Sequence, residues 1–418
     1  MGDKPPAPAP APIRPRLGRV ALSSGLLGAM FLMATSAVGP GFITQTTTFT
    51  AQLGAAFAFA ILVSILVDIA VQLNIWRVIG VSNTRAQDLA NKVLPGAGYL
   101  LAALIVFGGL VFNIGNIAGT GLGLDAMIGL DPRVGAIISA AVAIVILAVK
   151  QLGVALDRIL VVLGVLMIAL TAYVAFASNP PVGEALRQSV LPEAASSDLF
   201  LATITIIGGT VGGYITYAGA HRLIEQGRGG RENIAAITQT SVTGIIVTGL
   251  IRVLLFLAIL GVVSGGVAIM DSPNPSAEAF HQAAGEVGMR LFGMIMWAAA
   301  VSSVIGASYT SVSFVTTFSP WLERHKGKLV TGFIGISLAI YLISGQAPVT
   351  LLVMAGALNG VILPVGLGLL LWVAARHSRT LLDGYRYPRW LIVIGVAAWL
   401  LTAYMAVNSL SGIAALWQ

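Results

Sequence analysis

Long apolar stretches, each about as long as a helix that crosses a lipid bilayer, constrain the fold of this 418-residue chain more than any other feature. A membrane helix needs about 20 mostly apolar residues. We find eleven such stretches, at residues 22–50, 53–76, 95–121, 133–150, 157–178, 199–220, 233–264, 287–313, 329–345, 348–375 and 389–412. None alternates apolar and polar residues as the strands of a membrane barrel do. The sequence therefore predicts an all-α polytopic membrane protein with about eleven transmembrane helices.

The composition supports a lipid-exposed protein and excludes several kinds of chemistry. Only 9% of the residues are charged, whereas a soluble domain carries charge on about a quarter of its positions. The chain has no cysteine, which excludes disulfides, thiolate metal sites and cysteine nucleophiles, and its four histidines make a histidine metal cage unexpected. No paired acids, phosphate-binding loop or selectivity filter stands out. We therefore expect no enzyme, no channel, no metal ligands and no cofactor.

The basic residues are unevenly distributed between the two sides of the predicted membrane protein. With a cytoplasmic N-terminus, 19 of the 23 Lys and Arg residues fall on the cytoplasmic side, and most acids of the loops fall outside. This explains the net charge of +7 without a nucleic-acid partner. We expect a multi-pass protein of the plasma (inner) membrane, with a disordered cytoplasmic tail at residues 1–19 and the C-terminus outside.

Two of the apolar stretches contain helix-breaking residues near their centres. The first contains Gly39-Pro40-Gly41, and the sixth contains Gly208-Gly209 and Gly212-Gly213. Unwound backbone inside a membrane is tolerated where it lines a cavity, and paired breaks in two halves point to a binding site. The spacing predicts inverted five-helix repeats at 20–178 and 199–375, followed by an eleventh helix at 389–412. The alternative is that these residues only permit close packing or a kink.

These motifs resemble those of the Nramp family of transporters, which have the LeuT-type fold with broken helices 1 and 6. In that family a DPGN motif in the first helix and an MPH motif in the sixth supply Asp, Asn and Met ligands to a divalent transition metal. The corresponding positions here are Gly39 and Phe42 in the first stretch and Gly212 and Tyr214 in the sixth. Two acids that serve proton movement in the family correspond to Asn113 and Asn116, while RAQDLAN at 85–91 resembles the family's segment after the second helix. The resemblance thus implies the scaffold without the metal ligands or the proton-pathway acids.

The predicted substrate site consists of glycines, hydroxyls, amides and aromatic groups. Its members are Gly39, Gly41, Thr44, Gln45, Asn113, Asn116, Gly212, Gly213, Tyr214 and Tyr217. Helix N-termini at the breaks suit a carboxylate, whereas a dehydrated divalent cation needs charged or soft ligands. We therefore expect a small organic acid or an amino-acid-like solute. A divalent metal cation carried with part of its water is the alternative, and the threonines can also act by bonding their own backbone.

Charged and hydroxyl groups within other stretches suggest further roles. Asp68 and Arg252 are the charges deep in apolar stretches, and we expect them to pair, with a coupling-ion role for Asp68 as the alternative. Candidate ligands for a coupling sodium ion are Ser302, Ser303, Ser308 and Thr310, which could equally form a packing face. A proton is the other candidate coupling ion. Asn359 could simply bond a neighbouring helix.

Together these patterns predict a secondary transporter that works by alternating access in the lipid bilayer and carries a small molecule or an ion. The competing hypothesis is a sensor that retains the fold and does not transport. Accumulation of solute inside vesicles would separate the two, because a sensor binds without accumulating.

Overall fold

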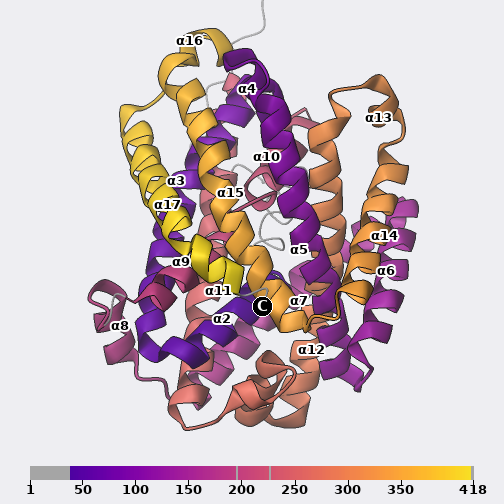
Figure 1. Cartoon of the computed structure of the whole chain (residues 1–418), viewed down its shortest axis with the longest axis vertical. Coiled ribbons are helices and arrows are strands. Elements are labelled where there is room, and N and C mark those ends of the chain that lie inside the picture. Colours follow the sequence, from indigo (N-terminus) through magenta and orange to yellow (C-terminus); the bar gives the residue numbers. More distant parts are fainter. Residues whose placement is uncertain (1–37, 194–195, 226, 416–418) are drawn as a thin grey trace, which may run out of the picture.

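The computed structural model describes residues 38–193, 196–225 and 227–415, and within these ranges the chain is helical, without β-strands (Figure 1). The predicted tail at 1–19 and the start of the first apolar stretch, up to residue 37, lie outside the described residues. The long helices run roughly along the long axis of the molecule and surround α5 and α15.

The first half of the described chain contains seven α-helices. They are α2 (Pro40–Leu53), α3 (Phe57–Ser82), α4 (Ala86–Val93), α5 (Ala97–Ile128), α6 (Pro132–Ala148), α7 (Lys150–Ala177) and α8 (Val182–Val190). A short 3-10 turn, η1 (Gly54–Ala56), joins α2 to α3.

The second half contains the remaining nine α-helices of the described residues. They are α9 (Ser197–Thr210), α10 (Ile215–Glu225), α11 (Ile234–Ser264), α12 (Pro275–Thr316), α13 (Pro320–Arg324), α14 (Lys326–Ser344), α15 (Pro348–Arg376), α16 (Ser378–Leu381) and α17 (Arg389–Ala415). Two further 3-10 turns, η2 (Arg231–Asn233) and η3 (Ile269–Asp271), flank α11.

The predicted multi-pass helical architecture is confirmed, but the count of eleven spans is not. Among the described residues, eight helical segments are long and apolar enough to cross a membrane, or nine if α7 and α8, bent by 108°, form one span. The count differs because α2 and α3 form one apolar segment through η1, and because α6 has only 17 residues. The repeat boundaries at 178 and 199 stay a prediction.

The break in the sixth apolar stretch lies where the glycines predicted it. Helix α9 ends at Thr210 and α10 begins at Ile215, with a turn between them in which Gly213 has a φ of 56°. A left-handed backbone of this kind favours glycine because it has no Cβ. At the first break, α2 begins at Pro40 with Gly39 in an extended conformation, and proline is well suited to the first position of a helix.

The helix predicted at 287–313 begins earlier than expected. Asn274 caps α12 by accepting a hydrogen bond from the backbone N–H of Ala277, and Pro275 follows at the first helical position. The chain then changes direction at Gly285, which has a φ of 65°. The segment before this kink is too polar to read as a membrane stretch, although the structure packs much of it into the molecule.

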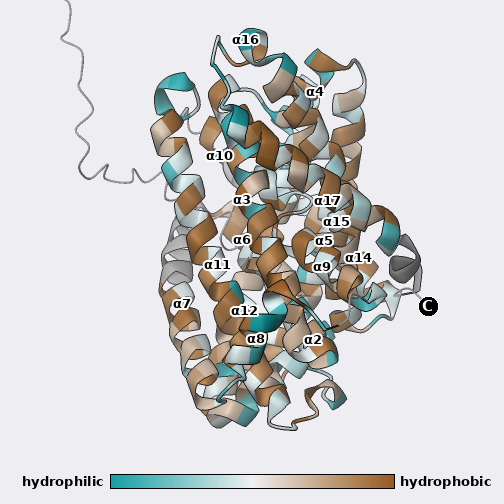
Figure 2. Cartoon of the chain, turned by 90° about the vertical axis from the view of Figure 1, so that its left-hand side faces the viewer, coloured by the Kyte–Doolittle hydropathy of each residue, from teal (hydrophilic) through white to brown (hydrophobic). Residues whose placement is uncertain are grey.

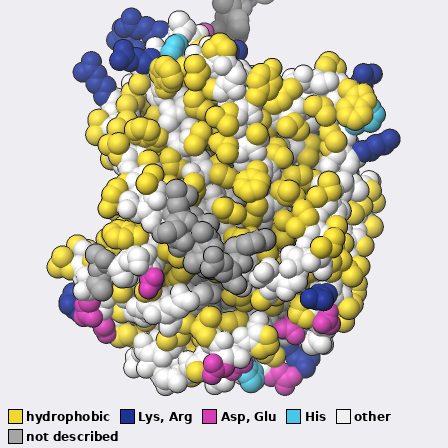
Figure 3. Space-filling view, viewed as in Figure 1, with side chains coloured by type: hydrophobic (Ala, Val, Ile, Leu, Met, Phe, Trp, Pro, Cys, Tyr) yellow, Lys and Arg dark blue, Asp and Glu magenta, His cyan; other side chains and the backbone are white. Residues whose placement is uncertain are grey.

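The surface and the interior have the character expected of a membrane protein. Large apolar side chains such as Phe176, Ile343 and Val407 are exposed on the outside, and apolar residues run along the outer helices in Figure 2. On the face shown in Figure 3, basic side chains gather at the upper end, near α13 and α16, and acidic ones at the lower end. The described part is therefore an apolar body with a basic end and an acidic end.

Candidate functional site

The N-terminal end of α2 is buried and has backbone donors without a partner among the described residues. Gly39 contributes no side-chain cap, the first turn contains no acid, and Pro40 has no N–H. The N–H groups of Gly41 and Phe42 consequently lack partners within the helix. Both residues are buried. This helix end therefore offers two amide donors and the positive end of the helix dipole.

Gln45, one turn further along α2, fits between three helices. Its Nε2 donates to the carbonyl oxygen of Leu352 on α15 at 2.8 Å. A Cβ at Gly209 on α9 would overlap its Oε1, and a Cβ at Gly356 on α15 would overlap its Nε2. Gln45 is fully buried, and within the described part of the chain its Oε1 has no hydrogen-bond partner. The two glycines thus make room for an amide whose acceptor oxygen is available to a donor.

The turn between α9 and α10 is supported by Asn359 of α15. The Nδ2 of Asn359 donates to the carbonyl oxygens of Gly108 at 3.0 Å and Ala355 at 2.8 Å. A Cβ at Gly213 would overlap Asn359 Oδ1, and a Cβ at Gly212 would lie 2.7 Å from the Asn359 carbonyl oxygen. Asn359 therefore bonds a neighbouring helix, and the glycines of the break allow it to approach.

Aromatic side chains connect the two breaks. The rings of Phe112 on α5 and Tyr214 lie 5.5 Å apart, nearly perpendicular to each other. A Cβ at Gly41 would lie 3.3 Å from Phe112, so this ring also touches the start of α2. Tyr217 packs against Phe314 and reaches Gly366 on α15. Phe112 was missed in the sequence, where nothing distinguishes it from the other apolar residues of its stretch.

The two asparagines of α5 are buried but differ in their contacts. Asn113 Nδ2 donates to Ser308 of α12 at 3.1 Å and to Ser337 of α14 at 3.0 Å, so it joins three helices. Neither polar atom of the Asn116 side chain has a hydrogen-bond partner. Thr44 is likewise buried, with an unpartnered hydroxyl. Asn116 and Thr44 thus hold unused polar atoms, whereas Asn113 already serves packing.

The four candidate sodium ligands lie on α12 and are all buried. The hydroxyl of Ser308 donates to the carbonyl oxygen of Val304 at 2.7 Å and accepts from Asn113. This residue therefore already has the contacts of a packing residue. All four residues, Ser302, Ser303, Ser308 and Thr310, stay predictions as ion ligands.

Asp68 of α3 and Arg252 of α11 form a buried ion pair. Arg252 Nη2 lies 2.8 Å from Asp68 Oδ2, and both side chains are at most 1% exposed. Arg252 Nη1 also donates to the carbonyl oxygen of Ser64 at 3.3 Å. The structure thus brings together the two charges that lie deep in the apolar stretches.

A polar cluster around Glu225 joins four elements at the basic end. The Glu225 carboxylate at the end of α10 accepts hydrogen bonds from Arg85 at 2.9 Å, Lys326 at 3.0 Å and the Tyr309 hydroxyl at 2.8 Å. Arg85 precedes α4, Tyr309 belongs to α12 and Lys326 begins α14. Nearby, partial burial raises the pKa of Asp88, outside the apolar helices, although Thr317, Arg85 and Lys92 act to lower it. This cluster was missed because its members are far apart in sequence.

No set of three or more His, Asp or Glu side chains that could hold a metal ion occurs among the described residues. At both breaks the polar groups that the structure describes are neutral.

The arrangement of long apolar helices around a broken helix defines a multi-pass membrane transporter of LeuT-type fold. The profile of the Nramp family (natural resistance-associated macrophage protein-like) matches residues 30–412. An uncharacterized membrane protein, YcsG of Bacillus subtilis (strain 168), is 51% identical over 92% of this chain and 94% of its own length. The chain therefore belongs to the Nramp family.

Solved structures agree with this fold. A manganese transporter of Eremococcus coleocola is similar with a TM-score of 0.74 and 16% identity, over 95% of this chain and 88% of that one. MhsT in complex with L-phenylalanine is similar with a TM-score of 0.66 and 17% identity, over 93% of this chain and 99% of that one. At these identities the likeness concerns the fold, and it confirms the predicted LeuT-type architecture.

Proposed function

We propose that this protein is a secondary transporter that carries a small organic acid or an amino-acid-like solute by alternating access. The observation that supports this most is Gln45, whose buried, unpartnered Oε1 lies one turn from the uncapped N-terminus of α2. Together they offer an acceptor and a group of backbone donors within one small volume.

The chemistry of these groups favours a solute with a carboxylate and an N–H donor. A carboxylate is stabilised by the free N–H groups and the dipole at a helix N-terminus. An ammonium or amide N–H of the same solute would satisfy Gln45 Oε1, whose burial without a partner costs free energy. A divalent cation that leaves water needs anionic or soft ligands, and the described residues at the breaks supply neither.

Alternating access requires a gate on each side of the substrate site, and the two gates open in turn. Two sets of contacts are suited to form these gates. At the acidic end, Ser276 Oγ lies 2.9 Å from Thr47 Oγ1, which ties the first part of α12 to α2. At the basic end, the Glu225 cluster ties α10 to α12 and α14. By the positive-inside rule the basic end is cytoplasmic. A plasma-membrane location with the N-terminus inside is part of the proposal. Sodium or a proton is the coupling ion.

A divalent metal is the second candidate substrate. It is favoured by the family and by the fold shared with a manganese transporter. A sensor on the same fold is the third candidate, and it would bind solute without moving it.

The test is a thermal-stability screen of the purified protein against manganese and other divalent metals, amino acids and small carboxylates, including the cyclic amino-acid derivative 5-oxoproline. We expect stabilisation by a carboxylate solute, and we expect a higher solute concentration to be needed for it in Gly209→Ala, in which a new Cβ displaces Gln45. The matched control is Gly335→Ala, where a Cβ meets no atom within 4 Å. A shift with a transition metal and none with organic acids would overturn the proposal.

A further inference from the structure

A cavity of about 480 Å³ lies far from the helix breaks, in the lower half of the molecule in Figure 1, where α8 packs against η1. It lies beside the last residues of α2, from Gln52 onward, whereas the break precedes Pro40 at the other end of that helix. At a rise of about 1.5 Å per residue, the two ends of α2 are about 20 Å apart. The cavity is therefore separate from the proposed substrate site.

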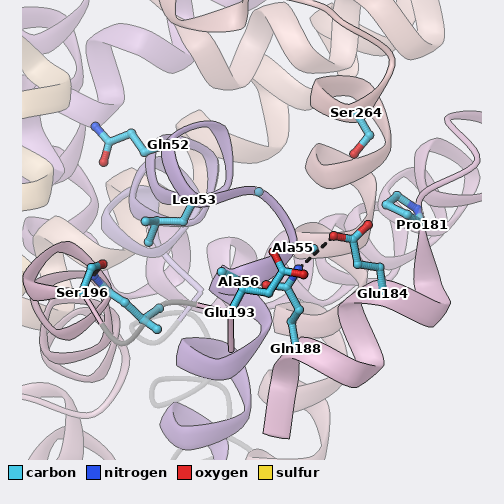
Figure 4. A pocket seen from close by; sticks show the side chains of 12 residues that line it. Gln52, Leu53, Ala55, Ala56, Pro181, Glu184, Gln188, Glu193, Ser196 and Ser264 are labelled. Atoms are coloured by element: carbon cyan, nitrogen blue, oxygen red, sulfur yellow. Dashed lines mark hydrogen bonds between the residues drawn. The ribbon is translucent and has the colours of Figure 1, made fainter. Parts of the chain in front are cut away.

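Three oxygen-bearing side chains converge in this cavity. Figure 4 shows Glu184, Gln188 and Glu193 turned toward one another beside Ala55. Gln188 Nε2 donates to Glu184 Oε1 at 2.9 Å. Gln188 is only 3% exposed, and its Oε1 has no hydrogen-bond partner among the described residues. A buried acceptor is thus left next to two carboxylates.

The backbone around the cavity adds to its negative character. Helix α2 ends there at Leu53 and α11 ends there at Ser264, and a helix C-terminus carries partial negative charge. The N-terminus of α9, which would favour an anion, is capped by Ser196 Oγ, 3.2 Å from the N–H of Leu199. The charged residues among the described lining of the cavity are both acids, although Glu193 also pairs with Arg187 outside it.

We propose that this cavity binds a hard divalent cation of the calcium type, held by Glu184, Gln188 Oε1 and Glu193. Carboxylate and amide oxygens are the ligands that calcium prefers, and its flexible coordination tolerates ligands from a helix and a loop. The bound ion would tie α8 to the loop that follows it, beside the junction of α2 and α3 and at the acidic end of the molecule. The proposal does not depend on the solute carried at the breaks.

The experiment titrates calcium chloride against the thermal stability of the full-length protein in a neutral detergent, at ionic strength held constant with sodium chloride. We expect saturable stabilisation with a Kd of about 0.1–1 mM, the range of extracellular calcium modules. Glu184→Gln and Glu193→Gln should each weaken binding about tenfold, since affinity follows the number of anionic ligands. Arg187→Gln should strengthen it, because it releases the Glu193 carboxylate from its ion pair.

A matched control is available on α12. Glu278 accepts a hydrogen bond from Gln282 four residues later, which is the same Glu–Gln pairing as in α8 but outside the cavity. Glu278→Gln should leave calcium binding unchanged. Absence of a calcium effect on the wild-type protein, an equal effect of sodium alone, or unchanged affinity in the well-exposed Glu193→Gln variant would overturn the proposal.

Discussion

The substitution Asp68→Asn should destabilise the protein, because it leaves the Arg252 guanidinium charged and buried without its anion. The two side chains touch at 2.8 Å and are at most 1% exposed. With charge centres about 4 Å apart, the attraction amounts to about 4 kcal/mol at an effective dielectric constant of about 20. Removal of one partner of a buried pair costs about 3–5 kcal/mol. We therefore expect Asp68→Asn to lower the free energy of unfolding by about 4 kcal/mol.

The paired variant separates the loss of the interaction from the cost of a stranded charge. Asp68→Leu combined with Arg252→Met removes both charges and fills the space with apolar atoms, so it should recover most of the lost stability. Thermal unfolding in detergent, measured for Asp68→Leu, Arg252→Met and the double variant, gives the coupling energy between the two side chains. Glu286→Gln, which breaks the exposed Glu286–Arg290 pair, is the control and should cost less than about 1 kcal/mol.

Uptake measurements on the same variants test the competing role for Asp68. If this carboxylate binds the coupling ion, Asp68→Asn would remain stable and its uptake would change its dependence on sodium or pH. That outcome would refute the structural account of the pair.

Three further predictions concern other parts of the molecule. Gly209→Ala should weaken solute binding about tenfold, the equivalent of one lost hydrogen bond, with Gly335→Ala unchanged in the same binding assay. Glu225→Gln should loosen the basic end, which can be followed at Ser313, a residue of α12 that is 1% exposed and whose carbonyl oxygen accepts a hydrogen bond from Arg85. Because the chain has no cysteine, we expect about tenfold faster maleimide labelling of Ser313→Cys in the Glu225→Gln variant than with Glu225 intact. Burial raises the pKa of Asp88, so its folded-state carboxyl holds a proton more tightly than the unfolded one. Its contribution to stability is therefore lost as pH rises through that raised pKa, and Asp88→Asn should lack this fall in thermal scans from about pH 4 upward.

Much of the fold could be predicted because helix position in a membrane protein follows apolar length. The stretches at 95–121, 233–264 and 348–375 match α5, α11 and α15 to within a few residues at most ends. The glycines at 208–213 marked the break between α9 and α10, since a left-handed turn favours glycine there. Apolar length and glycine position can both be read from residues that are neighbours in the sequence.

Apart from the Asp68–Arg252 pair, contacts between distant segments could not be predicted in the same way. The position of Gln45 between Gly209 and Gly356 depends on how α2, α9 and α15 pack, and no local pattern encodes that packing. The polar start of α12 was missed because hydropathy favours only its membrane part. Arg85 and Glu225 are 140 residues apart, so their pairing became visible only in the fold.

Uptake into proteoliposomes tests the central claim most directly. The protein is reconstituted under sodium and proton gradients, and accumulation of radiolabelled small carboxylates, amino acids and manganese is followed in parallel. Gly209→Ala is the comparison variant, in which uptake at low solute concentration should fall. The account predicts accumulation of a carboxylate-bearing solute, dependent on one of the two gradients, and none of manganese. Accumulation of manganese without any organic solute would contradict it, and binding without accumulation would favour the sensor.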